Sequence, residues 1–267
     1  MRRVALFSDI HANTMALDAV LADIASTEVE EVYCLGDLVG YGPDPSGVVE
    51  RIRTLGIPTI RGNYDEGIGT RRGECGCYYA TDQAKADGAA SYEFTDGALD
   101  DTDHEWLAAL PTEIRLEHEG VRILLAHGSP RKINEYLLLD RQDAQLVRLA
   151  VQAATDVVCI GHIHIPYHRV MTAEDGRIIH YASSGSVGKP KDGDPRAGWV
   201  ELVLGTKAEV NGACPDDHAA GPVGSPDAER VWLGAKVHRV DYDIEQVAQA
   251  VVAAGLPPRL AEALRVG

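Results

Sequence analysis

The chain has 267 residues, of which 45% are hydrophobic, and its formal net charge is -16 at pH 7. Such a chain can bury a real core, so disorder is not expected over most of its length. The acidity argues against broad binding to a nucleic-acid backbone, although it leaves room for one small basic pocket. No apolar run approaches the roughly 18 to 20 residues that span a membrane. We therefore expect a cytoplasmic protein without membrane association.

Strands and helices alternate in the first part of the sequence. Asn13 can cap a first helix, and Asp44 with Pro45 can start a second helix that ends at Gly56. A third amphipathic pattern covers residues 137–154. Short apolar runs with strand character lie at residues 4–7, 32–35, 58–60, 122–126, 157–160 and 178–182. This alternation predicts a layered α/β core.

The remaining segments have a different character. Residues 66–106 form a polar insertion with weak helical signals, and residues 205–230 are rich in Gly, Pro, Ala and Asp. We expect the second of these segments to be a long mobile loop. Two further strands and two short C-terminal helices are predicted at residues 199–204, 231–240, 244–254 and 258–264. Without an internal repeat or a second core, we expect one domain over residues 1–267.

Potential metal ligands follow five of the apolar runs. They are Asp9 and His11, Asp37, Asn63, His127, and the pair His162 and His164. In open α/β sheets ligands gather beyond the carboxyl ends of the strands, so these side chains should meet at one edge. In an extended D-x-H or H-x-H segment the first and third residues point to the same side. Each piece alone is a common structural feature, but five of them in succession favour a metal site.

The order D-x-H, G-D, G-N-x-D, H and G-H-x-H resembles that of the calcineurin-like metallophosphoesterases. The resemblance covers residues 9–164, and residues 36–45, 127–131 and 185–188 resemble the bacterial and archaeal phosphodiesterase-like branch. It implies an α/β (α+β) fold, a four-layer sandwich of two mixed β-sheets flanked by helices. It also implies two metal ions, the first held by Asp9, His11 and His164, the second by Asn63, His127 and His162, with Asp37 bridging both.

The resemblance also implies a chemistry. Two cations about 3.5 to 4 Å apart lower the pKa of a shared water, and the resulting hydroxide attacks phosphorus in line. The cations also neutralise charge on the phosphate oxygens. A mixed set of N and O ligands suits Mn²⁺, Fe or Zn²⁺ better than Ca²⁺. We expect a phosphodiesterase or a broad phosphatase that acts on a small phosphoester substrate.

Two alternatives remain open at this point. A nuclease of the same family is disfavoured by the acidity of the chain and its lack of a basic aromatic surface. A non-catalytic metal-binding scaffold or regulatory protein would be expected to lack ligands, whereas all seven are present in this chain. Intact ligands do not by themselves prove turnover.

The sequence departs from many relatives at Tyr64. Those relatives have His in the G-N-H-D or G-N-H-E segment, where this chain has Gly62-Asn63-Tyr64-Asp65. Tyr titrates near 10 and His near 6.5, so Tyr64 is a poorer proton source at pH 7. Tyr64 is either a hydrogen-bond donor to the substrate or a residue that only forms the wall of the site. Asp65 either orients a neighbouring residue or is an ordinary turn aspartate. We count both, with Asp37 and Asn63, as candidate catalytic residues and expect a preference for activated leaving groups or diesters.

A second departure concerns phosphate binding. The protein Ser/Thr phosphatases and diadenosine tetraphosphate hydrolases carry an Arg shortly after the G-D pair, where this chain has Gly40-Tyr41. This difference argues against either activity. Arg61 and Arg131 are the replacement candidates for phosphate binding, although each is also readable as a solvated or strand-flanking residue.

The cysteines and the other histidines have ordinary interpretations. The cysteine number is odd and no C-x-x-C pair exists, so reduced thiols are expected. Cys75-Gly76-Cys77 could bind a metal or form a strained disulfide, but ordinary loop thiols are favoured. We expect His180 in the core or beside a ligand. The other histidines outside the motifs are expected at the surface, namely His104, His118, His168, His218 and His238.

Overall fold

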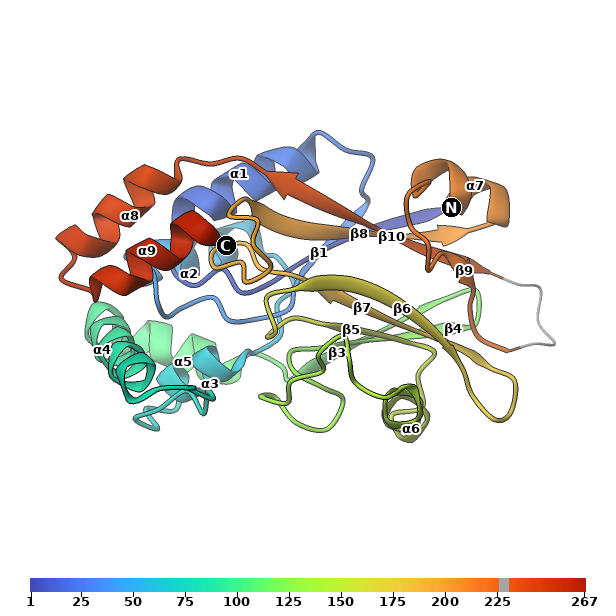
Figure 1. The fold of residues 1–267 in the computed structure, drawn as a ribbon, viewed down its shortest axis with the longest axis horizontal. Helices are drawn as coiled ribbons and strands as arrows, with labels where there is room; N and C mark the ends of the chain where they lie inside the picture. Colours follow the sequence, from blue (N-terminus) through green and yellow to red (C-terminus); the bar gives the residue numbers. More distant parts are fainter. Residues whose placement is uncertain (226–230) are drawn as a thin grey trace.

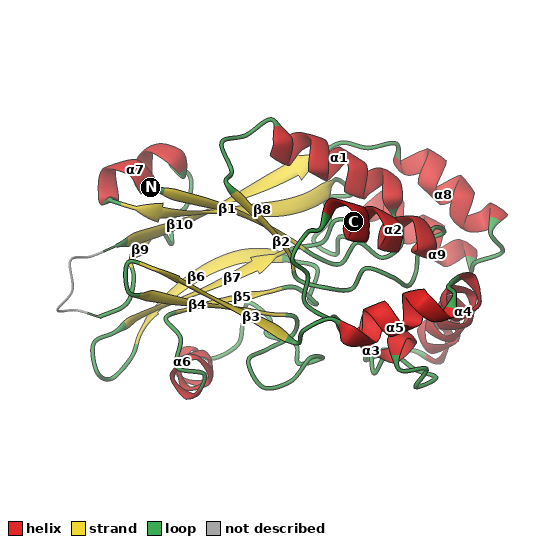
Figure 2. Cartoon of the chain, turned by 180° about the vertical axis from the view of Figure 1, so that it is seen from behind, coloured by secondary structure: helices red, strands yellow, loops and turns green. Residues whose placement is uncertain are grey.

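Two five-stranded mixed sheets lie face to face, with helices on their outer sides and at one end (Figures 1 and 2). The computed structural model describes residues 1–225 and 231–267. This architecture confirms the predicted sandwich of two mixed sheets flanked by helices. Within the described residues, no helix is both long and apolar enough to cross a membrane.

The first sheet has the strand order β2-β1-β8-β10-β9. Its strands are β1 Arg2–Phe7, β2 Glu31–Cys34, β8 Ala197–Gly205, β9 Gly221–Pro222 and β10 Trp232–Val240. β1 runs parallel to β2 and antiparallel to β8. The second sheet has the order β3-β4-β5-β7-β6. Its strands are β3 Glu113–His118, β4 Val121–Ala126, β5 Val157–Ile160, β6 Pro166–Thr172 and β7 Ile178–Ser184.

One hydrophobic core lies between the sheets and another under the helices of the first sheet, and strand β1 contributes to both. Val4 and Leu6 belong to the cluster between the sheets, whereas Ala5 and Phe7 pack with α1, Thr14–Ala25, on the outer face. Successive side chains of a strand point to opposite faces, so an unbroken apolar run suits a strand that is covered on both sides. The carboxyl ends of such strands are fixed rigidly from both faces.

Helix termini follow the capping signals in the sequence. The Asn13 side chain accepts a hydrogen bond of 3.1 Å from the Ala16 amide, and the Asp44 side chain accepts one from Gly47 at the start of α2, Pro45–Leu55. Gly56 ends α2 with φ 62°, the left-handed conformation that glycine adopts without penalty. Helix α6, Asp143–Gln152, begins later than the pattern over 137–154 predicted and packs on the second sheet.

The remaining helices gather mostly at one end of the molecule, at the left of Figure 1. They are α3 Asn63–Gly69, α4 Asp82–Ala98, α5 Asp101–Ala109, α8 Ile244–Ala253 and α9 Pro258–Val266. The polar insertion over 66–106 is therefore largely helical. Arg259 of α9 pairs with Asp87 of α4 at 2.8 Å, which joins the C-terminal helices to this insertion.

Several sequence predictions need correction. The segment 205–230, expected as a long loop, contains α7, Lys207–Ala213, and β9, while residues 226–230 lie outside the described part. Residues 58–60 form only an isolated bridge from Thr59 to Cys34. Strands β3 and β6 were not predicted, because both are half-exposed edge strands without a continuous apolar run.

Three histidines expected at the surface are largely buried. His104 is 4% exposed and its Nδ1 lies 2.8 Å from the Ile68 carbonyl. The His238 ring stacks on Trp199 with a centroid distance of 3.9 Å. His168 packs against His180, which is itself buried as expected. His218 is exposed, as predicted, and His118 is half-buried.

Candidate metal centre

The seven predicted ligands meet at one edge of the sandwich. Asp9 and His11 follow β1, Asp37 follows β2, His127 follows β4, and His162 and His164 follow β5, whereas Asn63 is the first residue of α3. Backbone hydrogen bonds hold the strand ends together, from Asp9 to Gly36 at 2.9 Å and from Gly161 to His127 at 2.9 Å. All seven side chains are buried. The carboxyl ends of the strands thus converge as the sequence pattern predicted.

The first group consists of Asp9, His11 and His164, whose donor atoms lie close enough together to hold one metal ion. The Nε2 atoms of His11 and His164 are 3.2 Å apart. Asp9 Oδ1 lies 3.3 Å from His164 Nε2 and 3.8 Å from His11 Nε2. Asp9 Oδ1 is buried and makes no hydrogen bond with any described residue. Such an orphaned buried oxygen is expensive unless a cation or another donor satisfies it.

The second group consists of Asp37, His127 and His162. Asp37 Oδ1 lies 3.4 Å from His127 Nε2, and the Asn63 side-chain oxygen lies 3.1 Å from the same nitrogen. His162 Nε2 is buried without a hydrogen-bond partner in the described chain. Asp37 Oδ2 faces the first group, 3.8 Å from His11 Nε2. Its two oxygens are therefore directed at different groups, as a bridging ligand requires.

Hydrogen bonds fix the ring orientation of three of these histidines. Nδ1 of His11 donates to the Val39 carbonyl at 3.0 Å, and Nδ1 of His127 donates to the Leu35 carbonyl at 2.7 Å. Nδ1 of His164 donates to the Lys189 carbonyl. A proton on Nδ1 leaves Nε2 as the lone-pair atom of a neutral ring, and a backbone carbonyl at Nδ1 is usual for metal-binding histidines. The donor set and its surroundings thus fit divalent metal ions.

Backbone conformation also marks these positions. Five of the candidate ligands adopt positive φ angles although none is glycine, namely Asp9 (53°), His11 (48°), Asp37 (54°), His162 (66°) and His164 (62°). Left-handed conformations are uncommon for such residues and persist only where the surroundings impose them. Here the buried strand ends and their cross-links impose them, and the result is that consecutive donors turn toward a common centre.

Asp65 holds the backbone around Asp37. Its two carboxylate oxygens accept hydrogen bonds from the amides of Asp37 at 2.8 Å, Gly62 at 2.8 Å and Leu38 at 2.9 Å. Asp37 Oδ1 in turn accepts one from the Tyr64 amide at 2.8 Å. Asp65 therefore orients a neighbour, one of the two interpretations left open by the sequence.

The protein environment alone shifts the protonation of these groups. Burial lowers the pKa of His11 to about 3 and that of His162 to about 4. Burial also opposes protonation of His127, but the neighbouring Asp37 carboxylate outweighs it and raises the pKa of His127 to about 9. Burial, with the charge of Asp37, raises the pKa of Asp65 to about 7. His11 and His162 are thus already neutral, as metal ligands must be.

The two groups open into a cavity of about 200 Å³. Tyrosines form much of its wall, namely Tyr41, Tyr64, Tyr78, Tyr79 and Tyr136. Tyr64 is fully buried, and burial raises its pKa well above the ordinary value, with Tyr41 and Tyr79 contributing. Lys189 and Lys191 also line the cavity, and neither was singled out in the sequence. Burial lowers the pKa of Lys189 to about 7, and repulsion from Lys191 adds to the effect.

The two arginines proposed for phosphate binding are not among the residues that line this cavity. Arg131 forms an ion pair with Glu135 at 2.6 Å and faces a separate pocket beside α6. Arg61 donates to the Ala108 carbonyl at 2.6 Å. Both lie close in sequence to candidate ligands, but their side chains are held by partners outside the centre.

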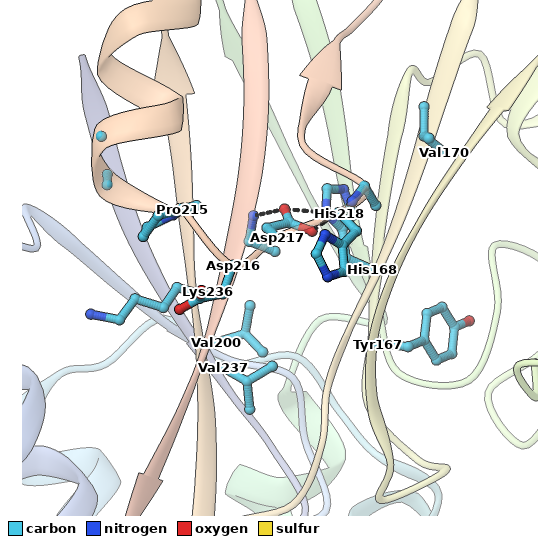
Figure 3. A pocket seen from close by; sticks show the side chains of 15 residues that line it. Tyr167, His168, Val170, Val200, Pro215, Asp216, Asp217, His218, Lys236 and Val237 are labelled. Atoms are coloured by element: carbon cyan, nitrogen blue, oxygen red, sulfur yellow. Dashed lines mark hydrogen bonds and ion pairs between the residues drawn. The ribbon is translucent and has the colours of Figure 1, made fainter.

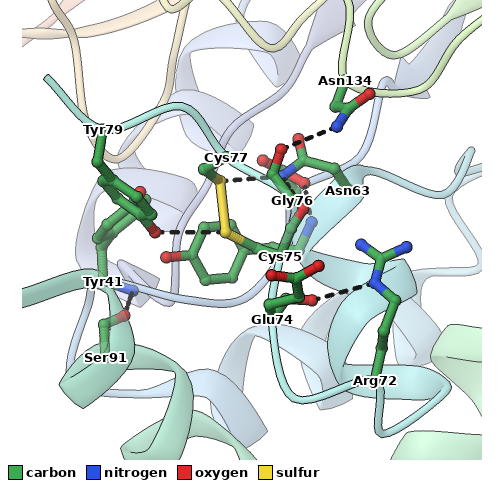
Figure 4. Close-up of a disulfide and its surroundings, with 12 residues drawn as sticks. Tyr41, Asn63, Arg72, Glu74, Cys75, Gly76, Cys77, Tyr79, Ser91 and Asn134 are labelled. Atoms are coloured by element: carbon green, nitrogen blue, oxygen red, sulfur yellow. Dashed lines mark hydrogen bonds between the residues drawn. A yellow bond between two sulfur atoms is a disulfide. The ribbon is translucent and has the colours of Figure 1, made fainter. Parts of the chain in front are cut away.

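A disulfide lies against the centre, which corrects the expectation of loop thiols at these positions (Figure 4). Cys75 and Cys77 are bonded to each other, while Cys34, Cys159 and Cys214 are free and buried. The Asn63 Nδ2 donates to the Cys75 carbonyl at 3.0 Å and to Cys77 Sγ at 3.2 Å. These contacts direct the amide nitrogen away from the second group, so that the amide oxygen faces His127.

A larger cavity of about 830 Å³ lies away from the centre, between β6, β10 and the segment after α7 (Figure 3). His168 and Asp217 line it, and their side chains are 2.7 Å apart. His168 Nε2 is 2.9 Å from His180 Nδ1, and His180 Nε2 donates to the Pro222 carbonyl at 2.9 Å. The polar groups of this cluster are thus satisfied by one another.

Comparison with known proteins agrees with the geometry. The model of the calcineurin-like phosphoesterase superfamily domain matches residues 2–204. An uncharacterized protein of Methanocaldococcus jannaschii is 28% identical over 279 residues, which cover 99% of this chain and 98% of that protein.

Solved structures also resemble the chain over almost its full length. A metallophosphoesterase from Sphaerobacter thermophilus is 28% identical, with 99% of each chain covered and a TM-score of 0.66. A hypothetical protein from Pyrococcus horikoshii OT3 shares the fold at 22% identity, with 99% of this chain and 98% of that chain covered and a TM-score of 0.74. The chain therefore belongs to the calcineurin-like phosphoesterase superfamily, and its general chemistry is metal-dependent phosphoester hydrolysis.

Proposed function

We propose that this protein hydrolyses small phosphoesters at two divalent ions, as a phosphodiesterase or a broad phosphatase. The observation that carries the proposal is the pair of adjacent donor groups, Asp9-His11-His164 and Asp37-His127-His162, in which lone-pair atoms face one another. Asn63 would complete the second group, and Asp37 would bridge the two. Nitrogen and oxygen donors suit Mn²⁺, Fe or Zn²⁺.

Each residue has a defined task in this proposal. Two divalent ions would supply a nucleophile at neutral pH and positive charge against the phosphoryl oxygens. The backbone carbonyls at Nδ1 hold the imidazoles of His11, His127 and His164 in the ligating tautomer. Asp65 fixes the turn that carries Asp37, and all seven donor side chains are buried. Tyr64 can donate its phenolic proton only weakly, so good leaving groups are favoured.

A cytoplasmic location is part of the same proposal. The three free buried cysteines support it, because reduced thiols are usual in that compartment.

The test combines metal content with turnover. The purified protein is analysed for bound metal and assayed with chromogenic monoesters and diesters, with and without added Mn²⁺. Asp37→Asn is compared with Asp217→Asn, which alters a half-buried aspartate in the distant cluster. We expect hydrolysis to collapse in Asp37→Asn only. Equal activity in Asp37→Asn would contradict the bridging role, and a protein with neither metal nor activity would be a scaffold instead.

A further inference from the structure

Three basic side chains line the metal cavity, and two of them have no carboxylate partner among residues 1–225 and 231–267. Arg259 is already paired, because its Nε and Nη2 donate to the Asp87 carboxylate at 2.8 and 3.3 Å. Lys189 and Lys191 form no ion pair within the described residues. The acidic residues that follow them are engaged elsewhere, Asp192 with Arg239 and Asp194 with Arg196 at 2.6 Å.

The segment that carries Lys189 is fixed directly to the metal centre. Ser186 Oγ donates to the Asp9 carbonyl at 2.8 Å, and the Gly188 amide donates to the same oxygen at 3.0 Å. The Lys189 amide donates to Ser186 Oγ at 2.9 Å, and its carbonyl accepts from His164. A Cβ at Gly188 would lie 1.8 Å from the Ile10 carbonyl oxygen, so only glycine allows this approach.

The side chain of Lys189 is also positioned. Its Nζ lies 4.7 Å from the ring centroid of Tyr41, a cation-π contact, and Tyr41 packs edge-on against His11 at 4.9 Å. The ammonium group is thus held beside the first donor group, and that of Lys191 lines the same cavity. The nearby carboxylates that attract Lys191 are Asp9 and Asp37.

Charge in the loaded centre would be strongly unbalanced. Asp9 and Asp37 together would neutralise only half the charge of two divalent ions, which leaves neither carboxylate to compensate Lys189 and Lys191. Asp65 adds one more carboxylate, and it is already committed to three backbone amides. Close, partly buried positive charges repel one another strongly, and a bound anion relieves the repulsion. A terminal phosphoryl group, with up to two negative charges, relieves more of it than a diester with one.

We propose that Lys189 and Lys191 bind the non-bridging oxygens of a terminal phosphoryl group and so make the site selective for phosphomonoesters over diesters. The inference rests on the proposed function, and it chooses phosphomonoesters over diesters as the substrate class. It replaces the preference for diesters that the sequence suggested at Tyr64, because Tyr64 concerns the proton of the leaving group and not the charge on the phosphoryl oxygens.

Phosphate binding tests the inference without any turnover. Binding of inorganic phosphate to the metal-loaded protein is measured by calorimetry for the parent, Lys189→Gln and Lys191→Gln, after metal content is shown to be unchanged. Lys207→Gln is the matched control, because Lys207 also lies over an aromatic ring, 4.9 Å from the centroid of Trp232, but outside this cavity. We expect each cavity variant to bind phosphate about tenfold more weakly. Lys189→Arg should restore most of the affinity.

Turnover gives the second readout. The ratio of kcat/KM for p-nitrophenyl phosphate to that for bis-p-nitrophenyl phosphate should fall about tenfold in each lysine variant and stay constant in Lys207→Gln. Unchanged phosphate affinity in both lysine variants would overturn the inference, even if the parent is an active hydrolase. If the parent hydrolyses neither ester but the lysine variants still bind phosphate more weakly than the parent does, the anion site is supported and the proposed function is contradicted.

Discussion

Two histidine clusters among the described residues differ in how their polar atoms are satisfied. In the metal centre, His11 and His164 both direct Nδ1 to backbone carbonyls, so their Nε2 lone pairs face each other across 3.2 Å. In the distant cluster, a continuous chain runs from Asp217 through His168 and His180 to the Pro222 carbonyl. Every ring nitrogen in that chain has a hydrogen-bond partner.

The difference separates a structural network from a ligand site. The distant cluster is complete as it stands, because its donors and acceptors match. The metal centre has an excess of acceptors, including the unsatisfied atoms Asp9 Oδ1 and His162 Nε2. Divalent cations fit such a set, since no described donor reaches these atoms. A count of histidines would not distinguish the clusters, whereas their hydrogen-bond partners do.

The strongest test of the difference between the two clusters removes one histidine from each of them. His164→Ala should lose metal from the first group and lower kcat roughly a thousandfold, more than the 10- to 100-fold loss usual for residues that only support a ligand. His180→Ala should keep its metal and most of its activity. Metal analysis and steady-state kinetics on both variants test this prediction. Equal losses of metal in the two variants would contradict the assignment of only one cluster as a metal site.

Asp65 and Asp217 allow a comparison of stability. Asp65→Ala leaves three buried amides without an acceptor and should lower the free energy of unfolding by about 3 kcal/mol or more. Asp217→Ala removes the acceptor for the Ala219 and Ala235 amides and for His168, with a similar effect. Urea denaturation measures both losses. Only Asp65→Ala should also weaken metal binding, and a parallel effect in Asp217→Ala would speak against a role specific to the centre.

Metal removal should affect one cluster only. A divalent ion at about 100 times its dissociation constant stabilises the folded state by about 2.7 kcal/mol for each site. We expect a chelator to lower the melting temperature of the parent and of His180→Ala by the same amount, measured by calorimetry. His164→Ala should respond less. A chelator that leaves the parent unchanged would show that the unsatisfied atoms bind no ion.

The smallest effect is expected at Tyr64. Tyr64→His introduces a better proton donor and should raise turnover of esters with poor leaving groups by up to about tenfold, with little change for p-nitrophenyl esters. Hydrolysis of alkyl and aryl esters by parent and variant is the measurement, with Tyr136→His as a control from another part of the cavity wall. If the ratio of alkyl to aryl ester turnover does not move, Tyr64 is only a wall residue.

The ligand set could be predicted because its signal is local. Each candidate ligand except Asn63 follows an apolar run that forms a strand. The carboxyl ends of neighbouring strands meet at one edge of the sheet, and this does not depend on the conformation of the loops. Asn63 instead opens α3, after a segment whose only ladder contact is the bridge at Thr59. Strands β3 and β6 escaped prediction because edge strands tolerate polar residues such as Arg115 and Glu117.

The surroundings of the ligands could not be predicted in the same way. Lys189 reaches the centre only because Ser186 binds the Asp9 carbonyl across 177 positions of the sequence. Arg131 is close to His127 in sequence but turns toward Glu135, a partner that no motif indicates. The pairing of His168 with Asp217 depends likewise on two segments that meet only in the folded chain.

The positive φ angles of Asp9, His11, Asp37, His162 and His164 have a consequence for how this protein can change over time. A glycine at any of these positions would relax the backbone and delete a ligand in the same step. Selection for stability alone would therefore replace these metal ligands by glycine, one position at a time. A lineage that keeps all five non-glycine residues records continued selection for the reaction, and a laboratory screen for thermostability would be expected to find inactive variants first at these positions.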